Sequence, residues 1–317
     1  LVLAEKVEGI DVIVGGHSHT TLSKPVVVAE DATPTIIVQT GNANNNLGVL
    51  DVKFDENGVI EDDNGELIEI NDKMEADAEA IEILRPYKEQ VDKVTKKEIG
   101  VSTPVELENP RTNGDDSKPS VRKNETILGN LITDGMLAKA RQFTGKDVTF
   151  AFQNGGGIRS AIDQGPITVG EVINVLPFGN TLAVMDLTGA ELKEAMEISV
   201  GKYPSENGGF LHLSGGKLVY DATKSVGERV VELYYQNEQG YFVPVKDAET
   251  YTVATNAFTA KGGDGYTVFA KAYEEGRVTD LGLSDWENFR DHLINIGSKG
   301  IPTEIEGRII NLDGKSP

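Results

Sequence analysis

Residues 147–159 read DVTFAFQNGGGIR and join an apolar stretch to three consecutive glycines. The first seven residues have the β-branched and aromatic composition of a strand, and the glycines mark the loop that follows it. On both sides of this stretch, strand-like and helix-like segments are mixed without strict alternation. We therefore predict an α+β fold with a central sheet for this part of the chain.

Residues that typically cap helices indicate where the neighbouring helices begin. Residues 125–141 have apolar side chains at helical spacing, and we predict a helix there that Asn124 caps. TVGE at 168–171 and TGAE at 188–191 match the capping box, which opens a helix. The remaining predicted elements are strands at 181–187 and 249–258, a hairpin at 230–245 and a helix at 284–297.

The first third of the chain is organised differently. Apolar runs at 10–16, 34–41 and 47–54 predict strands. Residues 72–98 then alternate charged and apolar side chains at helical spacing, which predicts either a domain-connecting helix or a surface helix. Pro86 is expected to kink or divide it. We predict a first domain at 1–71, a linker helix at 72–98 and a second domain at 99–317.

Composition limits the classes of function. The chain has 317 residues, 51 acidic and 30 basic side chains, a formal charge of −21 and no cysteine. This excess of negative charge disfavours a nucleic-acid polymer as partner, and the lack of cysteine excludes thiolate catalysis and disulfides. No apolar run approaches the length of a transmembrane helix. Because the chain starts at Leu1 with helix-like sequence, we expect it to be the C-terminal portion of a longer protein.

His17 and His19 are two of only four histidines, and they follow a glycine pair. In an extended segment, side chains two residues apart point to the same face, so both imidazoles could bind one metal ion. The pattern alone also fits a surface loop, and two ligands do not hold a catalytic metal. The other two histidines, His212 and His292, are interpreted as structural or surface residues.

Two arginines lie in sequence contexts that could bind an anionic ligand. The segment 154–159, NGGGIR, could offer consecutive backbone N–H groups together with the guanidinium of Arg159. Arg122 lies just ahead of a predicted helix start, which also favours an anion. A tight glycine loop and a solvated surface arginine are the alternative interpretations.

Aromatic rings in glycine-rich loops suit a flat base. Phe178 lies in PFGNTL, and Phe258 lies at a predicted strand end, six residues before Asp264 in a glycine loop. Two such rings can sandwich a base, and a carboxylate can accept hydrogen bonds from two vicinal hydroxyls. Local packing of both rings, with Asp264 in a turn, is the alternative.

Five segments taken in order resemble the motifs of the 5′-nucleotidase family. These are GGHSH (15–19), NETILGNLI (124–132), NGGGIR (154–159), PFGNTL (177–182) and NAFTAKGGDGYT (256–267). Members are two-domain, metal-dependent nucleotide phosphohydrolases. The resemblance covers essentially the whole chain. It implies a 5′-nucleotidase C-terminal domain with a mixed sheet layered with helices, preceded by the terminal strands of a four-layer αββα metallophosphoesterase domain.

The resemblance also implies roles for individual residues. By motif, His17 and His19 look like metal ligands, for two divalent ions that could be zinc, manganese or cobalt. The residues that look like the nucleotide site are Arg122, Asn154, Arg159, Phe178, Asn180, Phe258 and Asp264. Phe178 and Phe258 would stack the base, and Asp264 would accept from the ribose. The family's earlier metal motifs and its catalytic histidine are absent from this chain, so we assign no catalytic residue here and expect the chain alone to be inactive.

The implied function is metal-dependent hydrolysis of nucleotide phosphates, with a nucleotide or nucleoside as the small-molecule partner. Within the family, the alternatives are a 2′,3′-cyclic-nucleotide 2′-phosphodiesterase/3′-nucleotidase and a UDP-sugar hydrolase. An alternative of another class is a non-catalytic nucleotide-binding fragment. The resemblance implies an extracellular, cell-surface or periplasmic location, and the sequence does not predict the oligomeric state.

Overall fold

The stretch that follows residue 147 forms strand β7 (Val148–Asn154) and then the short 3-10 helix η1 (Gly155–Gly157). The computed structural model describes residues 1–30 and 33–313. Contacts within the chain divide it into two units, Leu1–Pro86 and Tyr87–Pro317.

The larger unit mixes helices and strands throughout. Its remaining strands are β6 (Glu98–Thr103), β8 (Gly165–Thr168), β9 (Thr181–Thr188), β10 (Leu211–Ser214), β11 (Gly216–Tyr220), β12 (Val230–Gln236), β13 (Phe242–Pro244), β14 (Thr250–Asn256), β15 (Val278–Ser284) and β16 (Ile309–Asn311). Its α-helices are α3 (Ile127–Thr144), α4 (Val169–Val175), α5 (Gly189–Val200), α6 (Ala257–Ala260), α7 (Thr267–Glu274) and α8 (Asp285–Ile296). Two further 3-10 helices are η2 (Gly263–Gly265) and η3 (Ser298–Gly300).

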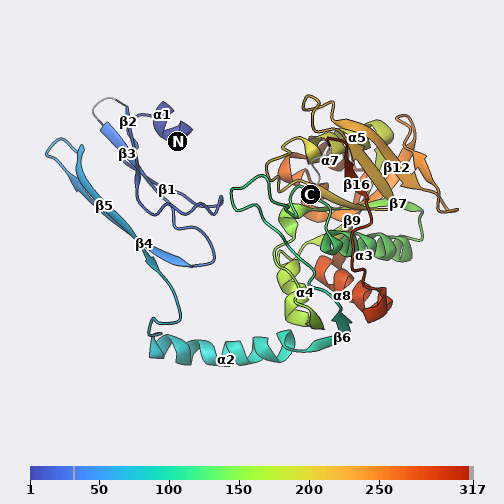
Figure 1. The fold of residues 1–317 in the computed structure, drawn as a ribbon, viewed down its shortest axis with the longest axis horizontal. Coiled ribbons are helices and arrows are strands. Elements are labelled where there is room, and N and C mark those ends of the chain that lie inside the picture. The colour runs from blue at the N-terminus through green and yellow to red at the C-terminus, as the bar shows by residue number, and fades with distance from the viewer. Residues whose placement is uncertain (31–32, 314–317) are drawn as a thin grey trace. The chain divides into compact units, whose positions relative to one another are not determined.

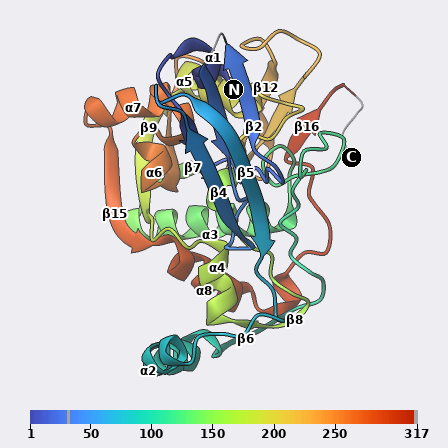
Figure 2. The same ribbon diagram turned by 90° about the vertical axis from the view of Figure 1, so that its left-hand side faces the viewer.

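A five-stranded sheet in the order β10-β7-β14-β9-β15 organises this unit. Strand β14 runs parallel to β7 and antiparallel to β9, so the sheet is mixed. Alternate residues of β9 pack in two different hydrophobic cores. Leu182 and Val184 pack with α3, α4 and α8, whereas Ala183 and Met185 pack with α5, α7 and the second sheet, β13-β12-β11-β16. Figures 1 and 2 show this layering, which confirms the predicted α+β fold with a central sheet.

Two of the predicted helix starts are confirmed and one is wrong. Thr168 and Thr188 each accept a hydrogen bond in a complete capping box, with Glu171 and Glu191 respectively. Helix α3, however, is capped by Thr126, whose side chain accepts from Gly129 N. The Asn124 side chain instead accepts from Ser120 N, within the preceding loop. Both residue types cap helices, and the tertiary fold of the loop decides between them.

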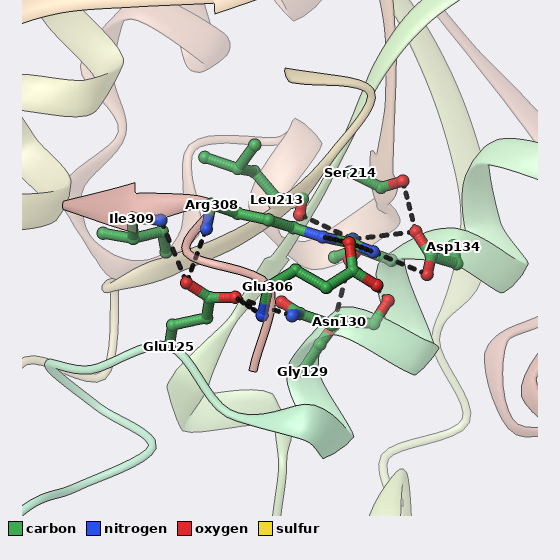
Figure 3. A network of polar contacts seen from close by, with 10 residues as sticks. Glu125, Gly129, Asn130, Asp134, Leu213, Ser214, Glu306, Arg308 and Ile309 are labelled. Carbon is green, nitrogen blue, oxygen red and sulfur yellow. Dashed lines mark hydrogen bonds and ion pairs between the residues drawn. The ribbon is translucent and has the colours of Figure 1, made fainter. Parts of the chain in front are cut away.

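A buried polar network holds the C-terminal strand β16 against helix α3, as Figure 3 shows. Glu125 accepts from the backbone N–H groups of Arg308 (2.6 Å) and Ile309 (3.1 Å). The Arg308 guanidinium then forms two 2.8 Å bonds with Asp134 on α3. Charged hydrogen bonds of this kind are strong when they are buried and fully paired.

The smaller unit has little core of its own. It contains α1 (Val2–Lys6), a sheet of β1 (Val12–Val14), β3 (Thr33–Val38) and β2 (Val26–Glu30), and the hairpin of β4 (Asn46–Phe54) with β5 (Ile60–Glu69). Among the described residues up to Pro86, only Ala4, Thr35 and Ile36 are buried. The predicted strands are therefore present, but most of their apolar side chains are only half-buried.

The division between the units falls inside helix α2 (Ala78–Thr95). This helix begins six residues later than predicted. It continues through Pro86, so of the two expected effects the division is wrong and the kink stays a prediction. None of its residues is buried. Its role as a domain connector stays a prediction. Within the described part of the chain, no helix has the length and apolarity required to cross a membrane.

Candidate functional site

Three loops meet at one edge of the five-stranded sheet. Asn256, at the end of β14, pairs with Leu182 near the start of β9, and Thr255 pairs with Phe152 near the end of β7. The Phe178 loop leads into β9, the glycine loop follows β7, and α6 with Phe258 follows β14. The sheet register thus brings three of the predicted nucleotide-site segments together.

A chain of amide and carboxylate groups runs across this edge. Asn154 Nδ2 donates to Asp264 Oδ2 (2.7 Å), and Asn256 Nδ2 donates to Asn154 Oδ1 (3.0 Å). Asp264 has a positive φ of 58°, an uncommon conformation that Asp tolerates better than most residues. The carboxylate is thereby fixed through one of its oxygens. Sequence reasoning missed Asn256, because it predicted one strand over 249–258, whereas β14 ends at Asn256 and this residue caps α6.

The two phenylalanines are exposed, at 61% for Phe178 and 47% for Phe258. The guanidinium carbon of Arg159 lies 5.7 Å from the centroid of the Phe178 ring, within cation–π range. The ring of Phe258 lies over Gly263, where a Cβ would overlap it. Each ring thus has a neighbour against it, Arg159 for Phe178 and Gly263 for Phe258, while about half of each residue stays exposed.

Positive charge gathers around Arg122. Burial lowers the pKa of Arg122, and the charges of Arg111 and Arg159 lower it further, whereas Glu206 and Asp264 raise it. The buried Nε of Arg122 has no hydrogen-bond partner among the described residues. Three arginines near two carboxylates leave a net positive charge, which favours an anionic ligand.

The predicted role of the glycines in 154–159 as an anion cradle is wrong for two of them. Gly155 N donates to Phe210 O and Gly156 N donates to Gly208 O, both at 2.7 Å. A Cβ at Gly155 would overlap Val121 O. Gly155 and Gly156 permit close approach of two backbones, so their N–H groups are not available to an anion.

Asn180 is occupied by helix α8. Its backbone oxygen accepts from Asp285 N (3.0 Å), and its side chain also hydrogen-bonds Asp285. Burial raises the pKa of Asp285 to about 6. These contacts give Asn180 a structural role at the start of α8, and a ligand contact stays a prediction.

His17 and His19 are both exposed and belong to the smaller unit. Their φ angles are 62° and 59°, so the extended geometry predicted for this segment is wrong. Imidazoles are suitable donors for a divalent ion. Among the described residues, however, no group of three or more His, Asp or Glu side chains could hold a metal. The donor set that these residues offer is therefore incomplete.

A hollow of about 790 Å³ lies elsewhere in the larger unit, bordered by Asp134, Glu306 and Arg308. Arg308 is ion-paired with both of these carboxylates. None of the residues that line this hollow belongs to the predicted nucleotide site.

Comparison with known proteins identifies the family of the chain. Residues 99–271 match the family model described as 5′-nucleotidase, C-terminal domain. Over 98% of its length, the chain is 42% identical to the trifunctional nucleotide phosphoesterase protein YfkN of Bacillus subtilis. The matched region makes up 20% of that protein. Over 83% of its length, it is 35% identical to the human 5′-nucleotidase, of which the matched region makes up 49%. The chain thus spans half or less of these curated relatives.

A solved structure gives the same result. The 5′-nucleotidase precursor from Thermus thermophilus superimposes with a TM-score of 0.80 at 38% identity, covering 100% of this chain and 62% of that one. The family model alone covers more than half of the present chain. On these matches and this fold, the chain belongs to the 5′-nucleotidase family.

Proposed function

We propose that the larger unit binds the nucleotide for an enzyme that hydrolyses nucleotide phosphates. The observation that carries the proposal is the meeting, at one sheet edge, of the Phe178 loop, Phe258 and the Asn154–Asp264 pair. The rings would stack the base, and Asp264 would accept hydrogen bonds from the ribose. Arg122 and Arg159 would contact the phosphate or ribose.

In this proposal, His17 and His19 supply two metal ligands, and further ligands come from outside the described residues. Two divalent ions, when bound, would polarise a water molecule and neutralise charge on the transferring phosphoryl group. Zinc, manganese and cobalt all accept imidazole ligands, and the donor set does not select among them. Without those further ligands, the chain alone would bind nucleotide and not hydrolyse it. By family, we propose an extracellular, cell-surface or periplasmic location.

The position of the scissile phosphate is open to direct test. A stacking pair accepts any flat base, so 5′-nucleotides, 2′,3′-cyclic nucleotides and UDP-sugars are all candidate substrates. The product of the whole gene should be assayed for phosphate release from AMP, 2′,3′-cyclic AMP and UDP-glucose. Fastest turnover of AMP supports the 5′-nucleotidase assignment, and fastest turnover of another substrate selects an alternative activity of the family. No hydrolysis of any of the three would favour a non-catalytic nucleotide-binding protein.

A further inference from the structure

The loop at 203–210, YPSENGGF, lies between α5 and β10 and contacts two segments of the proposed nucleotide site. Gly208 O accepts from Gly156 N, next to the Asn154 segment. Gly209 O accepts from the hydroxyl of Tyr266, two residues after Asp264. This loop therefore packs directly against the backbone of the site, although it supplies none of the predicted ligand contacts.

Within this loop, the carboxylate of Glu206 gathers donors from a distant part of the chain. It accepts from Arg111 Nε (2.9 Å) and Nη2 (2.8 Å), from Thr112 N (2.9 Å) and from Ser120 Oγ (2.6 Å). Burial raises the pKa of Glu206, but hydrogen bonds from Arg111, Ser120 and Thr112 outweigh it and lower the pKa to about 2. The carboxylate is thus ionised and fully engaged at neutral pH.

Two residues linked to Glu206 hold the backbone of Arg122. Ser120 Oγ, which Glu206 holds, accepts from Arg122 N (3.1 Å). Asn207, which follows Glu206 in the chain, donates its N–H to Arg122 O (3.0 Å). The N–H of Arg122 is therefore held by Ser120, which bonds Glu206, and its carbonyl by Asn207, which follows Glu206 in the chain.

We infer that Glu206 is a positioning residue that sets the place of Arg122 in the nucleotide site; this inference rests on the proposed function. A purely electrostatic role and a positioning role predict opposite changes in the Kd of an anionic ligand when the carboxylate is removed. Removing one negative charge beside Arg111 and Arg122 would strengthen binding of an anion if charge alone mattered. A positioning role weakens it, because Arg122 loses its fixed geometry. The sign of the change separates the two.

The test is the Kd of AMP, measured by calorimetry for the wild-type chain and for Glu206→Gln. We expect binding to weaken about tenfold in the variant. Glu191→Gln is the matched control, because Glu191 forms a similar two-bond pair with Arg277. It lies near Thr188, at the end of β9 opposite to Leu182. We expect Glu191→Gln to lower Tm and leave the Kd of AMP unchanged. Glu206→Gln would give that same result if Glu206 only stabilised the fold.

Ser120→Ala gives a second variant that changes no charge and removes the link between Glu206 and Arg122 N. It too should weaken AMP binding, and it decides the question if Glu206→Gln does not fold. A Kd in Glu206→Gln that is unchanged or tighter, while wild type binds AMP, overturns this inference alone. A wild-type chain that binds neither AMP nor adenosine overturns the proposed function and the inference with it.

Discussion

Asp264 is held by Asn154 through one carboxylate oxygen, so a single substitution can test what the carboxylate does for a ligand. Asp264→Asn is expected to weaken adenosine binding about tenfold, because hydrogen bonds to a charged group contribute about 1.5–3 kcal/mol. 2′,3′-Dideoxyadenosine lacks both hydroxyls and should bind the wild type and the variant equally. Calorimetric titration measures both ligands, and an equal loss for the two would contradict the ribose role.

His212 is fully buried, and its Nε2–H donates to Val121 O at 2.8 Å. Burial lowers the pKa of His212 from 6.5 to about 4. The native state therefore binds fewer protons than the unfolded state between pH 4 and 6.5, and this group's contribution to stability falls as pH drops through that window. The loss is on the order of 3 kcal/mol.

The His212 prediction can be read directly by nitrogen-15 NMR, because the chain has only four histidines. We expect the His212 ring to titrate with a midpoint near pH 4, and a midpoint near pH 6.5 would contradict the buried, neutral assignment. The structure also decides between the two interpretations of this residue made from sequence, since a fully buried histidine is structural.

The functional roles of individual residues differ in how well the sequence predicts them. Phe178 and Asp264 were visible because an aromatic ring or a carboxylate in a glycine loop is a local signal. Glu206 was not, because its partners Arg111 and Ser120 lie 95 and 86 residues away. Gly155 and Gly156 were misread for the same reason: the backbone that occupies their N–H groups belongs to the distant loop 203–210.

At the scale of elements, β16 depends on Glu125 for its attachment to α3. Glu125→Gln would turn an amide N–H₂ toward the backbone N–H groups that the carboxylate now accepts from. We expect a loss of about 3 kcal/mol in the free energy of unfolding, because buried donors left unpaired cost about 1–3 kcal/mol each. Urea denaturation measures this loss. Glu304→Gln, an exposed change in the segment before β16, is the control and should alter stability by less than about 0.5 kcal/mol.

Elements with signals at their own ends were predicted well. The capping boxes at Thr168 and Thr188 depend on residues three apart, and both are present. The short strands β10 and β16 escaped prediction because four and three residues carry too little periodicity, and pairing with β7 and β11 creates them. Pro86 was expected to kink or divide its helix, and α2 continues through it undivided.

At the scale of the whole molecule, the two units differ sharply in burial. Only three of the described residues up to Pro86 are buried, whereas the larger unit has two extensive cores. We expect amide hydrogen exchange to be fast across β1 to β5 and slow across β7 and β14, because local stability follows buried apolar contact. Adenosine should add protection in the larger unit only. Equal protection in both units would contradict this account.

The domain organisation predicted from sequence stays a prediction in its details. The change of character at residue 72 was readable because a charged helical pattern replaces strand-like runs. The structure divides the chain within α2 at Pro86, between the two predicted ends of the linker. Sequence could not locate this division, because it depends on which segments contact each other across the chain.

The central claim is that the larger unit clamps a nucleoside between Phe178 and Phe258 without help from metal. Calorimetric titration of the chain with adenosine in the presence of EDTA tests it most directly. Phe178→Ala and Phe258→Ala serve as variants, and Phe143→Ala on α3, whose side chain is 57% exposed, is the matched control.

We predict saturable binding by the wild type, no change for Phe143→Ala, and about tenfold or greater weakening for each clamp variant, since stacking contributes about 1–3 kcal/mol. Absence of saturable binding by the wild type, or variants that bind as tightly as it does, would contradict the account.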